Sequence, residues 1–156
     1  MIVRSAEEKD IPRLLALLSQ VQAIHAQGRP DLFEGAHTKY RPGDLKAILR
    51  DGDRPVFVAV DQDDQVLGYA FCILQQPSGD GNLRPRKALY IDDLCVDQAR
   101  RGEHIGQMLY AHVREAARAM GCYHITLNVW SLNQTAARFY EKMGLKPLKV
   151  TMESLL

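Results

Sequence analysis

The spacing of apolar residues along the chain switches several times between the period of helices and the period of strands. Ser5 with Glu8 has the form of a capping box, so a helix is expected to begin just after Ser5 and to end at the turn formed by residues 28–30. Further helices are predicted from Pro42 to about residue 50, over 103–120 and over 133–143. Strands are predicted over 1–5, 56–60, 66–74, 88–96 and 123–130, and residues 145–156 have room for one or two more.

This order of elements indicates an α/β fold. Strands early in the chain, followed by two late helices that cross between strands, predict a mixed sheet with helices on both faces. Five strands and a tail that supplies one or two more give an expected total of six or seven. No repeat or long linker divides the chain, so residues 1–156 are expected to form a single domain.

Composition narrows the class of protein. Twenty basic and nineteen acidic residues give a formal net charge of +1, which argues against nucleic acid or a membrane surface as a partner. No apolar run is long enough to span a bilayer, and the N-terminus does not have the form of a signal peptide. Three widely spaced cysteines predict reduced thiols in a cytoplasmic protein, not a disulfide framework.

The junction between the strand at 88–96 and the helix at 103–120 is suited to binding phosphate. Helix N-termini present unpaired N–H groups and partial positive charge, and Arg100 and Arg101 add to that charge here. Gly102 and Gly106 are expected to let the backbone approach a ligand. A plain connection between strand and helix explains the same residues, whereas the P-loop and dinucleotide motifs are absent.

A second group of residues lies on the helix that begins near residue 133. Asn133, Ala136, Ala137 and Tyr140 share one helical face, while Phe139 and Met143 lie on an apolar one. A thin ligand fits along such a face, with the Tyr140 phenol near its reactive end. The alternative is that the alanines only allow close packing on the sheet and that Tyr140 belongs to the core.

Residues 88–108, ALYIDDLCVDQARRGEHIGQM, and 123–145, YHITLNVWSLNQTAARFYEKMGL, resemble two consecutive segments of the GNAT superfamily of N-acetyltransferases. The resemblance covers the C-terminal half and implies a twisted, mostly antiparallel GNAT-like sheet. It also implies acetyl transfer from acetyl-CoA to the primary amine of a small molecule or peptide, without a metal. His104 departs from the family pattern at a glycine position, where a side chain is tolerated if the backbone stays right-handed. The imidazole is expected to point into solvent, and the alternative is that it faces the phosphates.

The resemblance also implies which residues hold acetyl-CoA. The pyrophosphate would contact the backbone of the loop and helix start, and the pantetheine arm would pair with the strand edge and pass along the later helix. These cofactor-binding residues are Leu94, Cys95, Val96, Arg101, Gly102, Glu103, His104, Ile105, Gly106, Gln107, Asn133, Ala136 and Ala137.

Direct attack of an amine on a thioester requires an acid and a base. By the same resemblance, Tyr140 is the general acid for the thiolate, because a phenol and a thiol have comparable pKa values. Side-chain alternation predicts that Asp92 and Asp93 point to opposite faces, so that at most one faces the acceptor. The resemblance favours Asp92 as the base, while the alternatives are Asp93, a water alone, or a structural role for both carboxylates. Phe33 and Tyr40, together with Asp92, are expected to contact the acceptor.

Other functions remain as alternatives. Cys95 has no evident histidine partner for an acetyl-cysteine intermediate. An acyl-CoA sensor without turnover and a transferase for a larger acyl group both fit the same motifs. A C-terminal strand at the sheet edge favours a homodimer.

Overall fold

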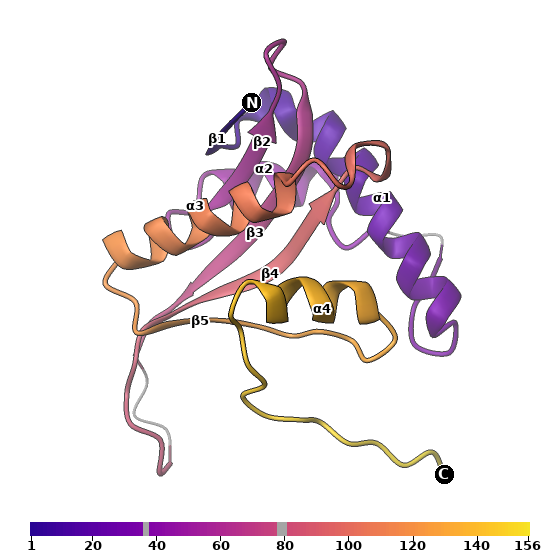
Figure 1. Ribbon diagram of the computed structural model, residues 1–156, viewed down its shortest axis with the longest axis vertical. Helices are drawn as coiled ribbons and strands as arrows, with labels where there is room; N and C mark the ends of the chain where they lie inside the picture. The colour runs from indigo at the N-terminus through magenta and orange to yellow at the C-terminus, as the bar shows by residue number, and fades with distance from the viewer. Residues whose placement is uncertain (36–37, 78–80) are drawn as a thin grey trace.

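The computed structural model describes residues 1–35, 38–77 and 81–156 of the chain. Two helices follow the first strand, three consecutive strands come next, and the last strand lies between two helices (Figure 1). The order is β1 (Ile2–Ser5), the 3-10 turn η1 (Glu8–Asp10), α1 (Ile11–Gly28), α2 (Pro42–Leu49), β2 (Val56–Val60), β3 (Val66–Gln75), β4 (Ala88–Val96), the 3-10 turn η2 (Gln98–Arg100), α3 (Ile105–Ala119), β5 (His124–Leu127) and α4 (Gln134–Lys142).

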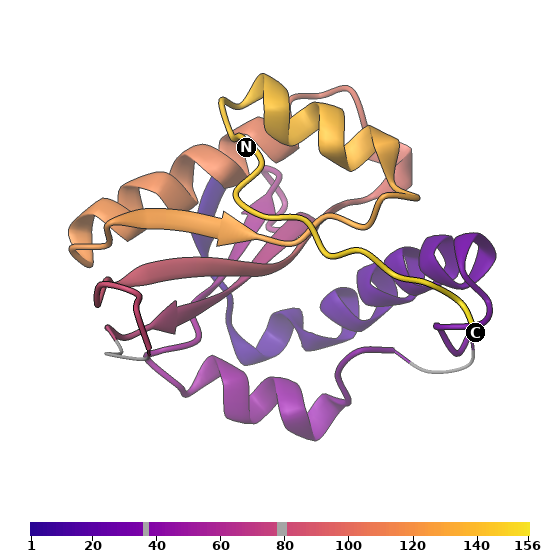
Figure 2. The same ribbon diagram turned by 90° about the horizontal axis from the view of Figure 1, so that it is seen from below.

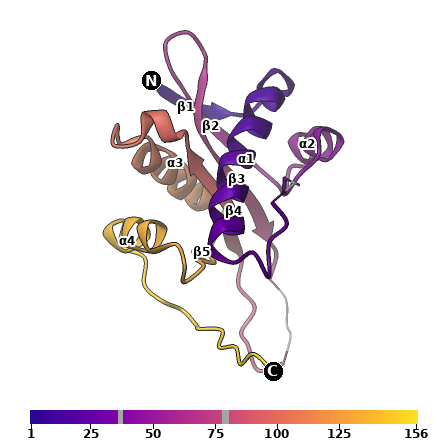
Figure 3. The same cartoon turned by 90° about the vertical axis from the view of Figure 1, so that its right-hand side faces the viewer.

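One twisted sheet in the order β1-β2-β3-β4-β5 forms the centre of the molecule. The first three pairings are antiparallel and the last, β4 with β5, is parallel. Helices α1 and α2 cover one face, and α3 and α4 lie on the other (Figure 3). The predicted α/β class, the mixed sheet and the helices on both faces are therefore confirmed.

The two faces of the sheet have separate cores. On one face, Leu14, Leu17 and Leu18 of α1 are buried against β2 and β3. On the other, Leu109 and Val113 of α3 pack against β3 and β4. Each helix buries the stripe of apolar residues that its sequence spacing predicts. Among the described residues, no helix is long and apolar enough to cross a membrane.

The first long helix begins later than the Ser5–Glu8 pattern predicts. The backbone N–H of Glu7 donates to the Asp10 carboxylate at 2.8 Å, and α1 follows from Ile11. Asp10 is buried, and the guanidinium of Arg4 binds it at 2.8 and 3.0 Å. Glu7 and Asp10 therefore form the capping box in place of Ser5 and Glu8, and Arg4 compensates the charge of the buried Asp10 carboxylate.

The predicted count of six or seven strands is wrong for the described residues, which form five. β5 ends at Leu127, three residues before the predicted end, because it pairs only with the first half of β4. Residues 146–156, here called the tail, contain no strand. The tail instead extends beyond α4 toward the C-terminal end of α1 (Figure 2).

Candidate functional site

The central feature of the site is an open stretch of backbone in β4. β5 pairs with β4 from Ala88 to Ile91 and then ends, while β3 continues along the other side of β4 to Val96. Within the described part of the chain, residues 92–96 therefore have no strand on the β5 side. An extended ligand that carries amides can hydrogen-bond to such an edge as a further strand would. Leu94, Cys95 and Val96 lie on this stretch, as predicted.

A β-bulge interrupts β4 at its two acidic residues. Phe71 pairs with Asp93 and Cys72 pairs with Ile91, so Asp92 is an extra residue without a partner in β3. The extra residue reverses side-chain alternation beyond it. Both carboxylates consequently face α1 and α2, where Asp92 contacts Tyr40 and Asp93 contacts Tyr69. The prediction that Asp92 and Asp93 lie on opposite faces is wrong for this reason.

Asp92 is the centre of a polar cluster on the α1–α2 side. The Tyr40 hydroxyl donates to one oxygen of Asp92, and the Lys39 ammonium lies 2.9 Å from the other. Arg54 in turn donates to the Tyr40 hydroxyl at 3.2 Å. Burial, and then the Asp92 carboxylate, raise the pKa of Tyr40 well above its usual value, so this phenol stays protonated and donates. The carboxylate thus already accommodates one primary ammonium group.

Asp93 lies in a different environment although it is the next residue. Burial raises its pKa to about 6, and the Tyr69 hydroxyl, which donates to it at 3.0 Å, opposes that rise. A carboxyl that titrates near pH 6 exchanges protons close to neutral pH, as a general base must. The sequence favoured Asp92 as the base and left Asp93 as an alternative.

The candidate phosphate loop follows β4 directly. Asp97 accepts from the backbone N–H of Ala99 at 3.1 Å and contacts Arg13 of α1, which fixes the end of the strand. Gly102 has a φ of +87°, a conformation that glycine adopts without strain. Helix α3 then begins at Ile105, and the N–H groups of its first turn lack partners within the helix. Arg101, Gly102 and Glu103 are exposed on this loop.

His104 is exposed immediately before α3, but its backbone is left-handed, with φ 62° and ψ 14°. The right-handed backbone that would tolerate a side chain at this position is therefore not what the structure has. The loop keeps the conformation that favours glycine, and a histidine adopts it at a cost of about 1 kcal/mol.

We expect His104→Gly to raise the free energy of unfolding by up to about 1 kcal/mol, because it removes the Cβ that disfavours this conformation. His104→Ala, which removes the imidazole but keeps the Cβ, should give no gain. Urea denaturation of both variants measures the difference. Equal stability of the two variants would show that the backbone conformation is not the cause.

Gly106 has a packing role that the sequence prediction missed. A Cβ on this residue would lie 3.2 Å from the ring of Phe139, so the missing side chain lets α4 approach the first turn of α3. Ile105 is buried beneath that turn, and Gln107 is partly buried. The helix that carries the predicted general acid thus rests on the candidate phosphate loop.

Helix α4 carries Tyr140, which lies close enough to Asp93 and Cys95 of β4 for these groups to affect its pKa. Asn133 caps this helix by accepting from the Ala136 N–H at 3.1 Å, which leaves the amide NH₂ of Asn133 to donate to a ligand. Ala136 and Ala137 are partly buried on the same face. Burial, and then the negative charge of Asp93, raise the pKa of Tyr140, so its hydroxyl stays protonated at neutral pH. This hydroxyl has no hydrogen-bond partner among the described residues.

Cys95 points into the core. Its thiol is buried, and this burial raises its pKa to about 12, helped by the nearby Asp93. A thiol in this state is a poor nucleophile at neutral pH. The structure therefore disfavours an acetyl-cysteine intermediate at this residue.

Aromatic side chains form a wall near the end of α1. Phe33 stacks on His25 with ring centroids 4.9 Å apart and meets Trp130 edge-on at 5.0 Å. Trp130 comes from the connection between β5 and α4, so the wall joins Phe33, a predicted acceptor residue, to the segment that leads into helix α4. Tyr40 belongs to the Asp92 cluster instead. The predicted acceptor residues therefore divide between two neighbouring groups.

Comparison with known proteins agrees with this geometry. The Acetyltransferase (GNAT) family model matches residues 19–145. Streptothricin acetyltransferase of Streptomyces lavendulae is 32% identical over 102 residues, which cover 65% of this chain and 50% of that protein. Glucosamine 6-phosphate N-acetyltransferase of Trypanosoma brucei brucei is 25% identical over 144 residues, with 92% and 88% covered. The matched part of the chain spans about half the length of the streptothricin enzyme and of two Bacillus subtilis relatives.

A solved structure extends the likeness to the whole chain. A point mutant of the BH1408 protein from Bacillus halodurans superimposes with a TM-score of 0.96 at 31% sequence identity, covering 100% of this chain and 99% of that one. The family match includes the open edge of β4, the loop before α3 and helix α4. The chain therefore belongs to the GNAT acetyltransferase family.

Proposed function

We propose that this protein transfers the acetyl group of acetyl-CoA to a primary amine on a small molecule or peptide. The observation that carries the proposal is that the open edge of β4 leads into a candidate phosphate loop and lies near Tyr140, a protonated phenol that has no hydrogen-bond partner among the described residues. Family membership supports the same reaction. When bound, acetyl-CoA supplies an acetyl group that is activated as a thioester.

The residues present fit this co-substrate in three places. The backbone N–H groups from Arg101 to Gln107 would hold the pyrophosphate, since they lie at a helix N-terminus with exposed basic charge nearby. The edge at residues 94–96 would hold the pantetheine amides, and a backbone N–H near Leu94 would polarise the thioester carbonyl. Asn133 would donate its amide NH₂ to the same arm, beside the small side chains of Ala136 and Ala137.

Two proton movements accompany the transfer. Asp92 would bind the acceptor ammonium in place of Lys39 and remove its proton through water, so that the free amine attacks the acetyl carbon. As the carbon–sulfur bond breaks, Tyr140 would give its proton to the departing thiolate. Asp93 is the second candidate for the base because its pKa of about 6 suits proton exchange near neutral pH.

The acceptor is expected to lie between the Asp92 cluster and the aromatic wall of His25, Phe33 and Trp130. The carboxylate attracts an ammonium group, and aromatic faces stabilise a nearby cation. Two relatives are named for small-molecule acceptors, streptothricin and glucosamine 6-phosphate. We therefore give small-molecule amines priority in an acceptor panel over peptide N-termini.

Acetyl-CoA should raise the melting temperature by roughly 5–10 °C at about 100 times its dissociation constant, because it binds only the folded chain. NAD, which has a diphosphate but no pantetheine arm, is the matched control and should give a much smaller shift. Thermal denaturation with each ligand measures the difference. Equal shifts, or none, would contradict the assigned site.

Turnover is tested by release of the CoA thiol in the presence of a panel of primary amines. Thiol release that depends on an amine, with formation of the acetylated amine, supports the transferase. Stabilisation by acetyl-CoA without turnover on any amine would favour a sensor that binds the thioester. Faster turnover with a longer acyl-CoA would assign a larger acyl group to the same site.

A further inference from the structure

The ammonium group of Lys39 occupies the place that the proposed acceptor amine would take. Its Nζ lies 2.9 Å from a carboxylate oxygen of Asp92, the candidate base, and donates to the backbone carbonyl of the same residue at 3.3 Å. The Lys39 side chain is 44% exposed, whereas that of Asp92 is 12% exposed, so the cation approaches a mostly buried carboxylate from the solvent side. A primary amine of the chain itself is therefore already bound to the group that is proposed to deprotonate the acceptor.

The charge of Lys39 acts on groups in both parts of the acceptor region. Burial raises the pKa of Asp93 to about 6, and the positive charge of Lys39 is one of the effects that oppose this rise. Burial, and then the charge of Lys39, lower the pKa of His25, which belongs to the aromatic wall. The Lys39 ammonium also lies 5.7 Å from the centre of the Tyr40 ring. Lys39 thus adjoins both the Asp92 cluster and the aromatic wall, between which the acceptor is expected to lie.

Lys39 also lies within reach of the proposed thioester position. Asp92 precedes Leu94, near which a backbone N–H would polarise the thioester carbonyl, by two residues, and two residues of an extended strand span about 7 Å. The flexible four-carbon stem of a lysine can carry a partly exposed Nζ over such a distance. Among the described contacts of the seven lysines, those of Lys39 are the only ones with residues 91–96.

We propose that Lys39 is itself an acceptor: its Nζ is acetylated, within one chain, when acetyl-CoA binds in the absence of another amine. The inference rests on the proposed function, because it uses the same thioester, base and acid. It goes beyond that function because it assigns a self-modification and its site. The reaction stops after one turnover, since the amide nitrogen of acetyl-lysine is not a nucleophile.

The bonds and protons of this step balance. The Lys39 ammonium gives one proton to Asp92, and the free amine then forms a bond to the acetyl carbon. The carbon–sulfur bond breaks, and the sulfur takes a proton from Tyr140. The nitrogen loses its second proton, which restores the Tyr140 hydroxyl, and the proton on Asp92 passes to water. The products are Nε-acetyl-lysine, CoA with a free thiol and one released proton, and the side chain has lost its positive charge.

Mass spectrometry of the protein incubated with acetyl-CoA alone is the first test. The mass should rise by one acetyl group, with release of one CoA thiol per chain, and peptide mapping should place the acetyl group on Lys39. Lys46, an exposed lysine of α2, reports uncatalysed acetylation in the same sample. Lys39 should react at least about 100-fold faster than Lys46, because the acid and the base assist only Lys39.

Three variants separate catalysed from uncatalysed transfer. Tyr140→Phe should slow acetylation of Lys39 by about 100-fold and leave that of Lys46 unchanged. Lys39→Arg keeps a cation beside Asp92 but has no nucleophilic amine, so the acetylation and the thiol release without added amine should both be lost. Lys46→Arg makes the same substitution outside the site and should leave both unchanged. Circular dichroism checks that the two arginine variants keep the fold.

The dependence on protein concentration shows whether the reaction occurs within one chain. The rate constant should be the same at all chain concentrations, and a rate constant that rises with concentration would overturn the proposal. Equal rates at Lys39 and Lys46, or a Lys39 rate that Tyr140→Phe leaves unchanged, would also overturn it. Thiol release with added amines but without acetylation of Lys39 would overturn this inference alone. Absence of thiol release under both conditions would overturn the proposed function as well.

Discussion

Replacement of Tyr140 by phenylalanine is expected to lower kcat by about 100-fold or more and to leave acetyl-CoA binding nearly unchanged. The variant loses one hydroxyl that has no hydrogen-bond partner among the described residues. The loss should be similar from mildly acidic to mildly basic pH, because burial and Asp93 keep this phenol protonated throughout that range. Thiol release at saturating amine gives kcat, and the thermal shift with acetyl-CoA reports binding.

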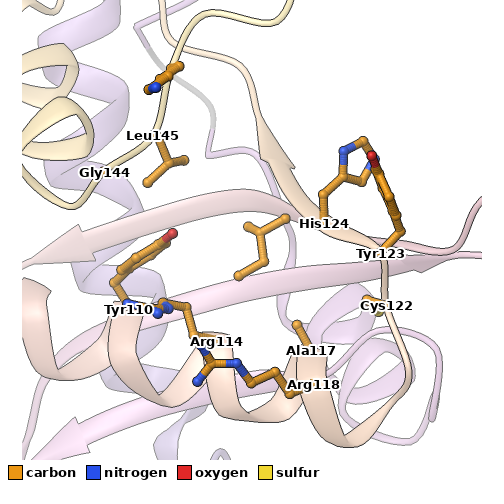
Figure 4. A pocket seen from close by; sticks show the side chains of 11 residues that line it. Tyr110, Arg114, Ala117, Arg118, Cys122, Tyr123, His124, Gly144 and Leu145 are labelled. Atoms are coloured by element: carbon orange, nitrogen blue, oxygen red, sulfur yellow. The ribbon is translucent and has the colours of Figure 1, made fainter.

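The neighbouring Tyr110 of α3 offers a matched control. Tyr110→Phe removes the same atom from a buried tyrosine that lines a recess of about 320 Å³ between α3, β5 and Leu145 (Figure 4). No role in the transfer is assigned to Tyr110, so kcat should change little. An equal loss in both variants would indicate a general effect of removing a hydroxyl from this region. Unchanged rates in Tyr140→Phe would remove Tyr140 from the chemistry.

Asp92→Asn is expected to lower kcat/KM for the amine by about 100-fold, because the amide neither attracts the ammonium nor takes its proton. Asp93→Asn makes the same change one residue away and still accepts from Tyr69, so its effect above pH 7 should be several-fold at most. Rates over a range of pH, with melting temperatures of both variants, measure the comparison.

The reverse order of effects would assign the proton transfer to Asp93. The kcat/KM of the unaltered protein would then fall as pH drops through about 6, where Asp93 takes up a proton. Stability has the opposite sign. The folded-state pKa of Asp93 is raised from 3.8, so ionisation costs stability as pH rises from about 4 to 6. Asp93→Asn should therefore be more stable than the unaltered protein at neutral pH, and this gain should shrink in acid.

Periodic features of the fold could be predicted from the sequence. The apolar stripe of α3 follows from spacing, and β2 and β3 follow from continuous runs of β-forming apolar residues; the predicted bounds of all three lie within two residues of those observed. The phosphate loop and the face of Asn133, Ala136, Ala137 and Tyr140 could be located because short motifs define them. Their roles in binding and catalysis stay predictions.

The remaining features depend on contacts that one segment cannot reveal. The bulge at Asp92 arises from the register between β3 and β4. In the sequence alone, two adjacent aspartates are equally compatible with a regular strand. The left-handed backbone of His104 follows from the path of the loop before α3. A histidine at this position does not by itself predict that conformation. Lys39 and Trp130 lie near the site through loops that sequence spacing does not relate to it.

The close approach of Phe139 to Gly106 packs together the two helices that would bind opposite ends of the proposed co-substrate. One end would rest on the helix that contains Gly106, and the other would meet the phenol on the helix that contains Phe139. Because Gly106 has no Cβ, α3 and α4 pack closely, and this packing would set the distance between the diphosphate site and the Tyr140 hydroxyl. A shift of either helix alters the reach from diphosphate to sulfur, so variation in side-chain size at these two positions offers a route to new acyl-chain preferences.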